Sequence, residues 1–143
     1  MPSKTLPRQR PPKTWRMEFT PNPRCVALVR RQVERAMTAW GCDADDTAAV
    51  VLICSELATN AVEHACVAGE NFEVRVTAVG KECLIEVADP SDVPPSPASP
   101  DVEAEHGRGL QLVAALADSV GHWYRSPTGK VVWARMVLGT SAA

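Results

Sequence analysis

The segment 48–67 constrains the fold of this chain most, because its residues are apolar on almost every side of a helix. Val50, Ile53, Leu57 and Ala61 recur at helical spacing on one side, and further apolar residues lie between them. A helix that is apolar nearly all round is buried in the core of a domain. We therefore expect 48–67 to form a central helix, capped at Asp43.

Three polar residues interrupt this helix at a regular spacing. Glu56, Asn60 and His64 are four residues apart, and each step of four turns about 40° past a full turn, so they form one narrow stripe. Burying such groups is costly unless a partner satisfies them. A carboxylate can deprotonate a hydroxyl, and an amide oxygen suits Mg²⁺. On spacing alone, either a polar ligand or a solvent-facing helix edge explains the stripe.

The remaining elements alternate between strand and helix patterns. We expect strands at 15–20, 72–78, 83–87, 119–125 and 131–138, a helix from 22 to 40, and another after the glycines at 107 and 109. Gly80 and Lys81 fit a two-residue type II′ turn. Strands joined by tight turns pair antiparallel. The sequence therefore predicts an α/β two-layer sandwich, with a mostly antiparallel mixed sheet and helices on one face.

One long segment, 90–106, has no periodicity and is rich in proline and serine. Long loops of this kind inside a compact domain are usually lids, binding loops or disordered segments. We expect a lid at 90–106 within a domain spanning 15–139. The basic, proline-rich residues 1–14 are predicted to be a disordered arm, and 140–143 a short tail.

Two features flank this loop. Asp89 ends a strand, where its carboxylate can accept a hydrogen bond from an exocyclic amine, although an acid that simply starts a turn fits as well. Gly107 and Gly109 allow close approach of a phosphate at a helix N-terminus, and Arg108 could contact it. A hinge would also explain the two glycines.

Composition narrows the class of protein. A length of 143 residues favours one domain, and a net charge of −2 gives no basic field for nucleic acid. No apolar run approaches the length of a membrane span, and residues 1–14 lack the apolar stretch of a secretory signal. The five cysteines have no CxxC spacing, which favours free thiols in a reducing compartment, the cytoplasm, over a zinc site.

The polar motifs resemble, in order, those of the GHKL ATPase/kinase superfamily. Residues 56–65 resemble the N box, 89–92 a degenerate G1 box and 107–110 the G2 box. The small size and the two helices before the first hairpin are similar to bacterial anti-sigma-factor serine kinases of the RsbW/SpoIIAB type. The resemblance covers about residues 16–138.

This resemblance implies ATP and Mg²⁺ as cofactors. Glu56 would be the general base that activates a partner's hydroxyl, Asn60 the Mg²⁺ ligand and Asp89 the acceptor of the adenine amine. The implied cofactor-binding set is Asn60, His64, Asp89, Ser91, Val93, His106, Gly107, Arg108, Gly109 and Leu110. The implied partners are a sigma factor and a STAS-type anti-anti-sigma protein, with the chain acting as a cytoplasmic homodimer that contacts neither nucleic acid nor membrane directly.

The sequence departs from the family pattern at two places. Ser91 stands where the G1 box has glycine, and 102–106 is acidic where relatives often carry a basic residue. Ser91 is expected to weaken nucleotide affinity. The acidic residues are expected to lower the catalytic rate, because acids beside a triphosphate are unfavourable. One alternative is therefore a non-catalytic nucleotide-binding or sigma-factor-sequestering module. The detached ATP-binding half of a histidine kinase ranks last, because no helical region with a phosphoacceptor histidine precedes the domain.

Overall fold

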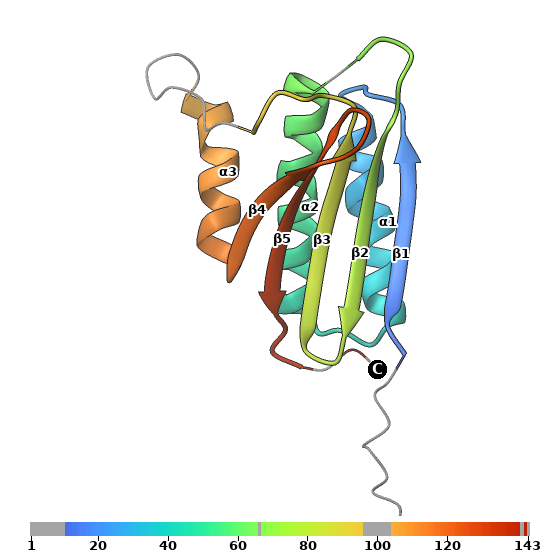
Figure 1. Ribbon diagram of the computed structural model, residues 1–143. Coiled ribbons are helices and arrows are strands. Elements are labelled where there is room, and N and C mark those ends of the chain that lie inside the picture. The colour runs from blue at the N-terminus through green and yellow to red at the C-terminus, as the bar shows by residue number, and fades with distance from the viewer. Residues whose placement is uncertain (1–10, 66, 96–103, 141, 143) are drawn as a thin grey trace, which may run out of the picture.

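The part of the chain that the structure describes forms three helices and five strands (Figure 1). The structure is a computed structural model that describes residues 11–65, 67–95, 104–140 and 142, with side chains in the third helix described from residue 110 onward. Its elements are β1 (Lys13–Phe19), α1 (Cys25–Ala39), α2 (Ala44–His64), β2 (Phe72–Val79), β3 (Glu82–Asp89), α3 (Ala104–Leu116), β4 (Ser119–Tyr124) and β5 (Lys130–Val137).

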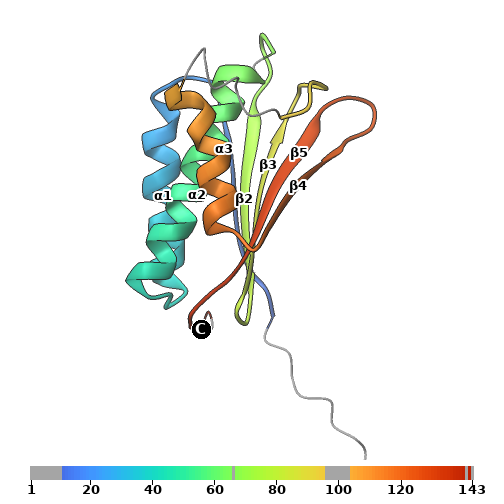
Figure 2. The same cartoon turned by 90° about the vertical axis from the view of Figure 1, so that its left-hand side faces the viewer.

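The five strands form one sheet in the order β1-β2-β3-β5-β4, with the three helices layered on one face (Figure 2). The α/β two-layer sandwich is therefore confirmed. Every pair of neighbouring strands in the described part is antiparallel, whereas we expected a mostly antiparallel mixed sheet. A mixed sheet would need two parallel strands side by side. Strands β3 and β4 do run parallel, but β5 lies between them and pairs antiparallel with both.

Strand β2 and strand β3 follow the alternation of their sequence. Val74 and Val76 of β2 and Ile85 and Val87 of β3 are buried against the helices, and their neighbours in sequence are more exposed. The hairpin turn between the two strands has Gly80 at φ 58°, and Val79 pairs with Glu82. Positive φ at the first turn residue fits the predicted type II′ turn.

The start of α2 is capped as predicted. Asp43 is the N-cap, and its Oδ1 accepts a hydrogen bond of 2.8 Å from the backbone N–H of Asp46. The start of α1 differs from the prediction. Asn22 accepts a bond from the N–H of Arg24 in a turn that precedes the helix, so α1 begins at Cys25.

The start of α3 also differs from the prediction. The helix begins at Ala104, so residues 104–106 belong to α3 and the glycines at 107 and 109 lie inside its first two turns. Alanine and glutamate at 104 and 105 are good helix formers, and a glutamate in the first turn favours the helix dipole. The expected arm and lid fall mainly on residues 1–10 and 96–103, which lie outside the described residues, while β1 begins two residues before the expected strand.

Helix α2 is the centre of the helical layer. It contacts α1, α3 and strands β2 and β3, and its residues Val50, Ile53, Leu57 and Ala58 are buried in the core. Full burial of a valine, leucine or isoleucine contributes about 1.5–3 kcal/mol each. The polar stripe on α2 is therefore held at a fixed distance from the end of β3 by a tightly packed core.

Candidate functional site

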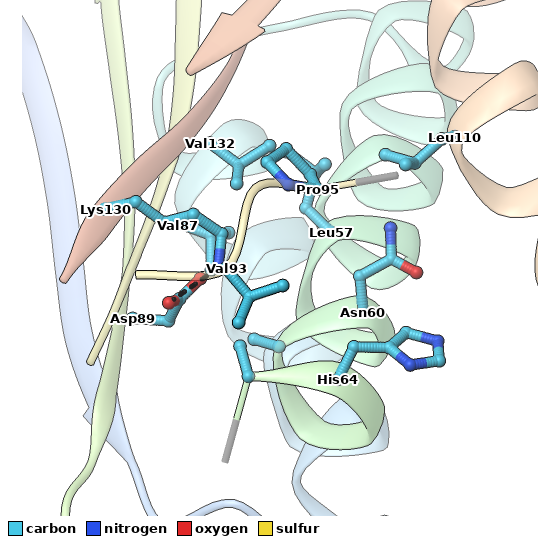
Figure 3. A pocket seen from close by; sticks show the side chains of 12 residues that line it. Leu57, Asn60, His64, Val87, Asp89, Val93, Pro95, Leu110, Lys130 and Val132 are labelled. Carbon is cyan, nitrogen blue, oxygen red and sulfur yellow. Dashed lines mark hydrogen bonds and ion pairs between the residues drawn. The ribbon is translucent and has the colours of Figure 1, made fainter. Parts of the chain in front are cut away.

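A pocket of about 270 Å³ opens between α2, α3 and the ends of β3 and β5 (Figure 3). Its walls are mainly apolar, with a few polar side chains, as in many small-molecule sites. The lining residues are Leu57, Asn60, Ala61, His64, Ala65, Val87, Asp89, Val93, Pro95, Leu110, Lys130 and Val132.

Asn60 and His64 come from α2 and lie on the same side of the pocket as Leu110 (Figure 3). The Nδ2 atom of Asn60 is buried and has no hydrogen-bond partner among the described residues. A buried polar group left without a partner costs about 1–3 kcal/mol. A ligand with polar atoms would remove that cost, so Asn60 marks the polar side of this pocket.

Asp89 lies across the pocket from Asn60, at the end of β3 (Figure 3). Its Oδ1 accepts one bond of 2.9 Å from the N–H of Ser91 and one of 3.0 Å from Nζ of Lys130. Burial raises the pKa of the Asp89 carboxyl, and Lys130 and the Ser91 N–H partly oppose this. Arg125 holds the Asp89 carbonyl oxygen at 2.9 Å from its Nη2 atom.

The loop after β3 is fixed by short-range bonds and by the β4–β5 turn. The N–H of Val93 donates to Oγ of Ser91, and the N–H of Gly129 donates to Oδ1 of Asp92 at 2.7 Å. Val93 and Pro95 thereby form a wall of the pocket, whereas Ser91 is not among the lining residues. In this structure the Ser91 hydroxyl bonds within the loop and does not narrow the pocket.

Glu56 lies one helical turn before Asn60 on α2 and is half-buried, but it does not line this pocket. Of the predicted G2 residues, Leu110 lines the pocket. His106, Gly107, Arg108 and Gly109 are in α3, and their side chains lie outside the described part of the chain. Because the helix starts at Ala104, Gly107 and Gly109 both lie beyond the free N–H groups of the helix start.

Sequence reasoning missed Lys130, which begins β5. The signal was present in the sequence, because Lys130 is followed at alternate positions by Ala134 and Met136, which are buried in the core, and by Val132, which is partly buried against it. A lysine in phase with core positions needs a buried partner. That partner, Asp89, is 41 residues earlier in the chain.

Other candidate chemistry is not found in the described residues. No group of three or more His, Cys, Asp or Glu side chains there could hold a metal ion, and no helix there is long and apolar enough to cross a membrane. Cys25, Cys42, Cys54 and Cys83 are free, and burial raises the pKa of Cys83 to about 12. A thiol with so high a pKa is a poor nucleophile.

Comparison with known proteins identifies the family. The model of the histidine kinase-like ATPase domain matches residues 19–136, most of the chain. The chain belongs to the histidine kinase-like ATPase domain family. Membership implies that this ATPase domain binds ATP, and it agrees with the resemblance to the GHKL superfamily noted in the sequence.

A solved structure gives independent support for the fold of this ATPase domain. The structure of the RsbU and RsbW domains of Rv1364c from Mycobacterium tuberculosis matches with a TM-score of 0.68 and 20% identity, covering 90% of this chain. The chain spans 33% of the length of that protein chain. No curated protein matches the sequence.

Proposed function

We propose that this ATPase domain is an anti-sigma factor and a serine/threonine protein kinase. In this proposal it binds ATP with Mg²⁺, transfers the γ-phosphate to a STAS-type anti-anti-sigma protein, and binds a sigma factor as its second partner. It works as a cytoplasmic homodimer without direct contact to nucleic acid. Strand β1, at one edge of the sheet, offers backbone groups to which a second chain could add.

The observation that carries the proposal is the pairing of Asn60 and Asp89 across one pocket. Asn60 has a buried amide nitrogen without a partner in the described chain, and Asp89 accepts both of its recorded side-chain bonds on Oδ1, which leaves Oδ2 for a ligand donor. The unpaired amide donor of Asn60 suits a phosphate oxygen and its amide oxygen suits a phosphate-bound cation, while the Asp89 carboxylate suits an adenine amine. The described residues therefore fit the nucleotide that the family implies.

In this proposal, each residue of the site has a role that follows from its position in or beside the pocket. The bound magnesium nucleotide supplies the phosphoryl group and the positive charge that offsets its transfer. Asp89 and the apolar wall orient the base, and Asn60 orients the phosphate end. Glu56, one turn before Asn60 on α2, holds the partner's hydroxyl and accepts its proton on the carboxylate.

The test is transfer of label from [γ-³²P]ATP to the cognate STAS protein. We expect labelling by the wild type and loss of labelling by Glu56→Ala, with ATP binding retained. Glu34→Gln, at an exposed position on α1, is the matched control and should label normally. Equal labelling by Glu56→Ala would exclude Glu56 as the base.

A non-catalytic regulatory module is the second candidate. Two observations favour it: Glu56 is not on the pocket wall, and Lys130 already neutralises Asp89. A thermal-shift series with ATP, with and without Mg²⁺, separates the cases, because a ligand present at 100 times its Kd stabilises by about 2.7 kcal/mol. If millimolar ATP does not raise the melting temperature, the result favours a module that sequesters a partner without nucleotide. If ATP raises the melting temperature but no phosphate is transferred, the result favours a nucleotide with a structural role.

A further inference from the structure

The pocket wall holds a buried ion pair of which the proposed function uses only Asp89, and Lys130 has no role in it. Lys130 is 3% exposed and Asp89 2% exposed, their charged atoms are 3.0 Å apart, and both residues line the pocket (Figure 3). Each comes from a core-facing position at one end of its strand, where β3 and β5 pair Asp89 directly with Lys130.

Stability alone does not explain this pair. Removing two charges from water costs several kcal/mol per ion, and replacing a buried pair by apolar residues of similar volume is often neutral or stabilising. The neighbouring core positions on the same two strands, Val87 and Val132, are apolar. A role toward a ligand therefore accounts better for the two charged groups in the wall of a pocket.

Both groups keep unused hydrogen-bonding capacity. A lysine ammonium has three donors, and Nζ of Lys130 uses one toward Oδ1 of Asp89 at 3.0 Å and one toward the carbonyl of Ser91 at 3.5 Å. Oδ2 of Asp89 accepts no bond among the described residues. The pair therefore presents one free donor beside one free acceptor.

We propose that Lys130 and Asp89 together read the adenine ring, with Lys130 donating to N1 and Asp89 accepting from the 6-amino group. The inference rests on the proposed nucleotide binding and adds a specificity residue to it. On the Watson–Crick edge of adenine, the 6-amino group is a donor and the neighbouring N1 is an acceptor. These two groups match the free acceptor of Asp89 and the free donor of Lys130. Leu57, Val87 and Val132 supply the apolar surface for the ring.

The same arrangement makes the pocket selective. A base that carries a hydrogen on N1 places a donor against the Lys130 ammonium, so one of the buried groups loses its partner. Sites built to hydrogen-bond a particular group reject analogues that lack it, because their buried polar groups are then left unpaired. We therefore expect inosine triphosphate to bind more weakly than ATP.

The experiment compares ATP with 1-deaza-ATP, in which N1 is replaced by C–H, by calorimetry on the full chain. Loss of a hydrogen bond from a charged donor corresponds to about a 10- to 100-fold weaker Kd, which we expect for the wild type. Lys130→Met should bind the two nucleotides with about equal Kd. Arg125→Met is the matched control, because Arg125 holds the Asp89 backbone from outside this pocket, and it should keep the wild-type ratio.

The outcomes are distinguishable. Equal binding of the two nucleotides by the wild type overturns the assignment of Lys130 without recourse to any variant, so a Lys130→Met protein that fails to fold does not matter. An unchanged ratio in a folded Lys130→Met protein also overturns it, as does GTP binding more tightly than ATP. If the wild type binds no nucleotide at all, the proposed function fails, and this inference with it.

Discussion

At the scale of single residues, the site depends on the carboxylate of Asp89 and the ammonium of Lys130, which are buried together. Asp89 and Lys130 are both almost fully buried, and the carboxylate also accepts the N–H of Ser91. Burial favours the neutral form of the carboxyl, whereas the ammonium and the N–H favour its charged form. Burial is the larger effect, so the pKa of Asp89 is raised.

A raised pKa predicts a pH dependence of stability with a definite sign. The folded chain holds the Asp89 proton more tightly than the unfolded chain, so this stabilisation is present below the unfolded pKa, near 4, and is lost as pH rises through the folded value. The unfolding free energy of the wild type relative to Asp89→Asn should therefore fall from about pH 4 toward neutrality. Urea denaturation of both proteins at a series of pH values measures this difference. A difference that grew with pH would mean that Lys130 outweighs burial.

At the scale of elements, α2 carries both the core and the polar stripe. Its first turn is fixed by the Asp43 cap, while Asp46 accepts bonds from the N–H groups of Gly139 and Thr140 and so ties the helix start to the end of the chain. These bonds fix the start of α2, and the buried side chains of Ile53 and Leu57 fix the rest of the helix against the core. The direction in which Asn60 points is thus set by the packing of α2 along its length, with Leu57 and Ala61 in the core on either side of it.

The cap of α2 gives a prediction at this scale. Asp43→Ala removes the acceptor of the Asp46 N–H and should lower the unfolding free energy by about 1 kcal/mol. Asp45→Ala is the control, because Asp45 is exposed in the same turn and acts only through the helix dipole. Urea unfolding curves compare the two variants. An equal loss in both would show that the cap bond adds nothing beyond charge.

At the scale of the whole molecule, the two layers enclose one core on a single face of the sheet (Figure 2). Successive residues of β3 therefore have different surroundings: Ile85 is fully buried under the helices, and Leu84 is half-buried on the opposite face. The pocket lies where this core ends, so its apolar floor is a continuation of the core packing.

This asymmetry predicts unequal effects of two neighbouring truncations. Ile85→Ala leaves a cavity beneath the helices and should cost about 2–5 kcal/mol. Leu84→Ala removes a side chain of similar size from the opposite face and should cost markedly less, because solvent or a side-chain shift can fill the space. Chemical denaturation of both variants measures the difference. Similar losses would contradict a one-sided core.

The sequence by itself determined the local structure. The Asp43 cap, the Gly80 turn and the alternating faces of β2 and β3 were predicted correctly, because each depends on backbone conformation or on periodicity within a few residues. The starts of α1 and α3 were predicted a few residues away from where they lie. At these positions several neighbouring residues can begin a helix, so the local sequence does not single out one of them. The motif order also led correctly to the ATPase family.

Only the tertiary structure decided which of these residues meet. It joined Lys130 to Asp89 and left Glu56 off the pocket wall that Asn60 lines. The physical reason is that such contacts depend on strand order, on register and on the rotation of α2 against the sheet. These are set by packing between segments far apart in the chain, and no periodicity within one segment specifies them.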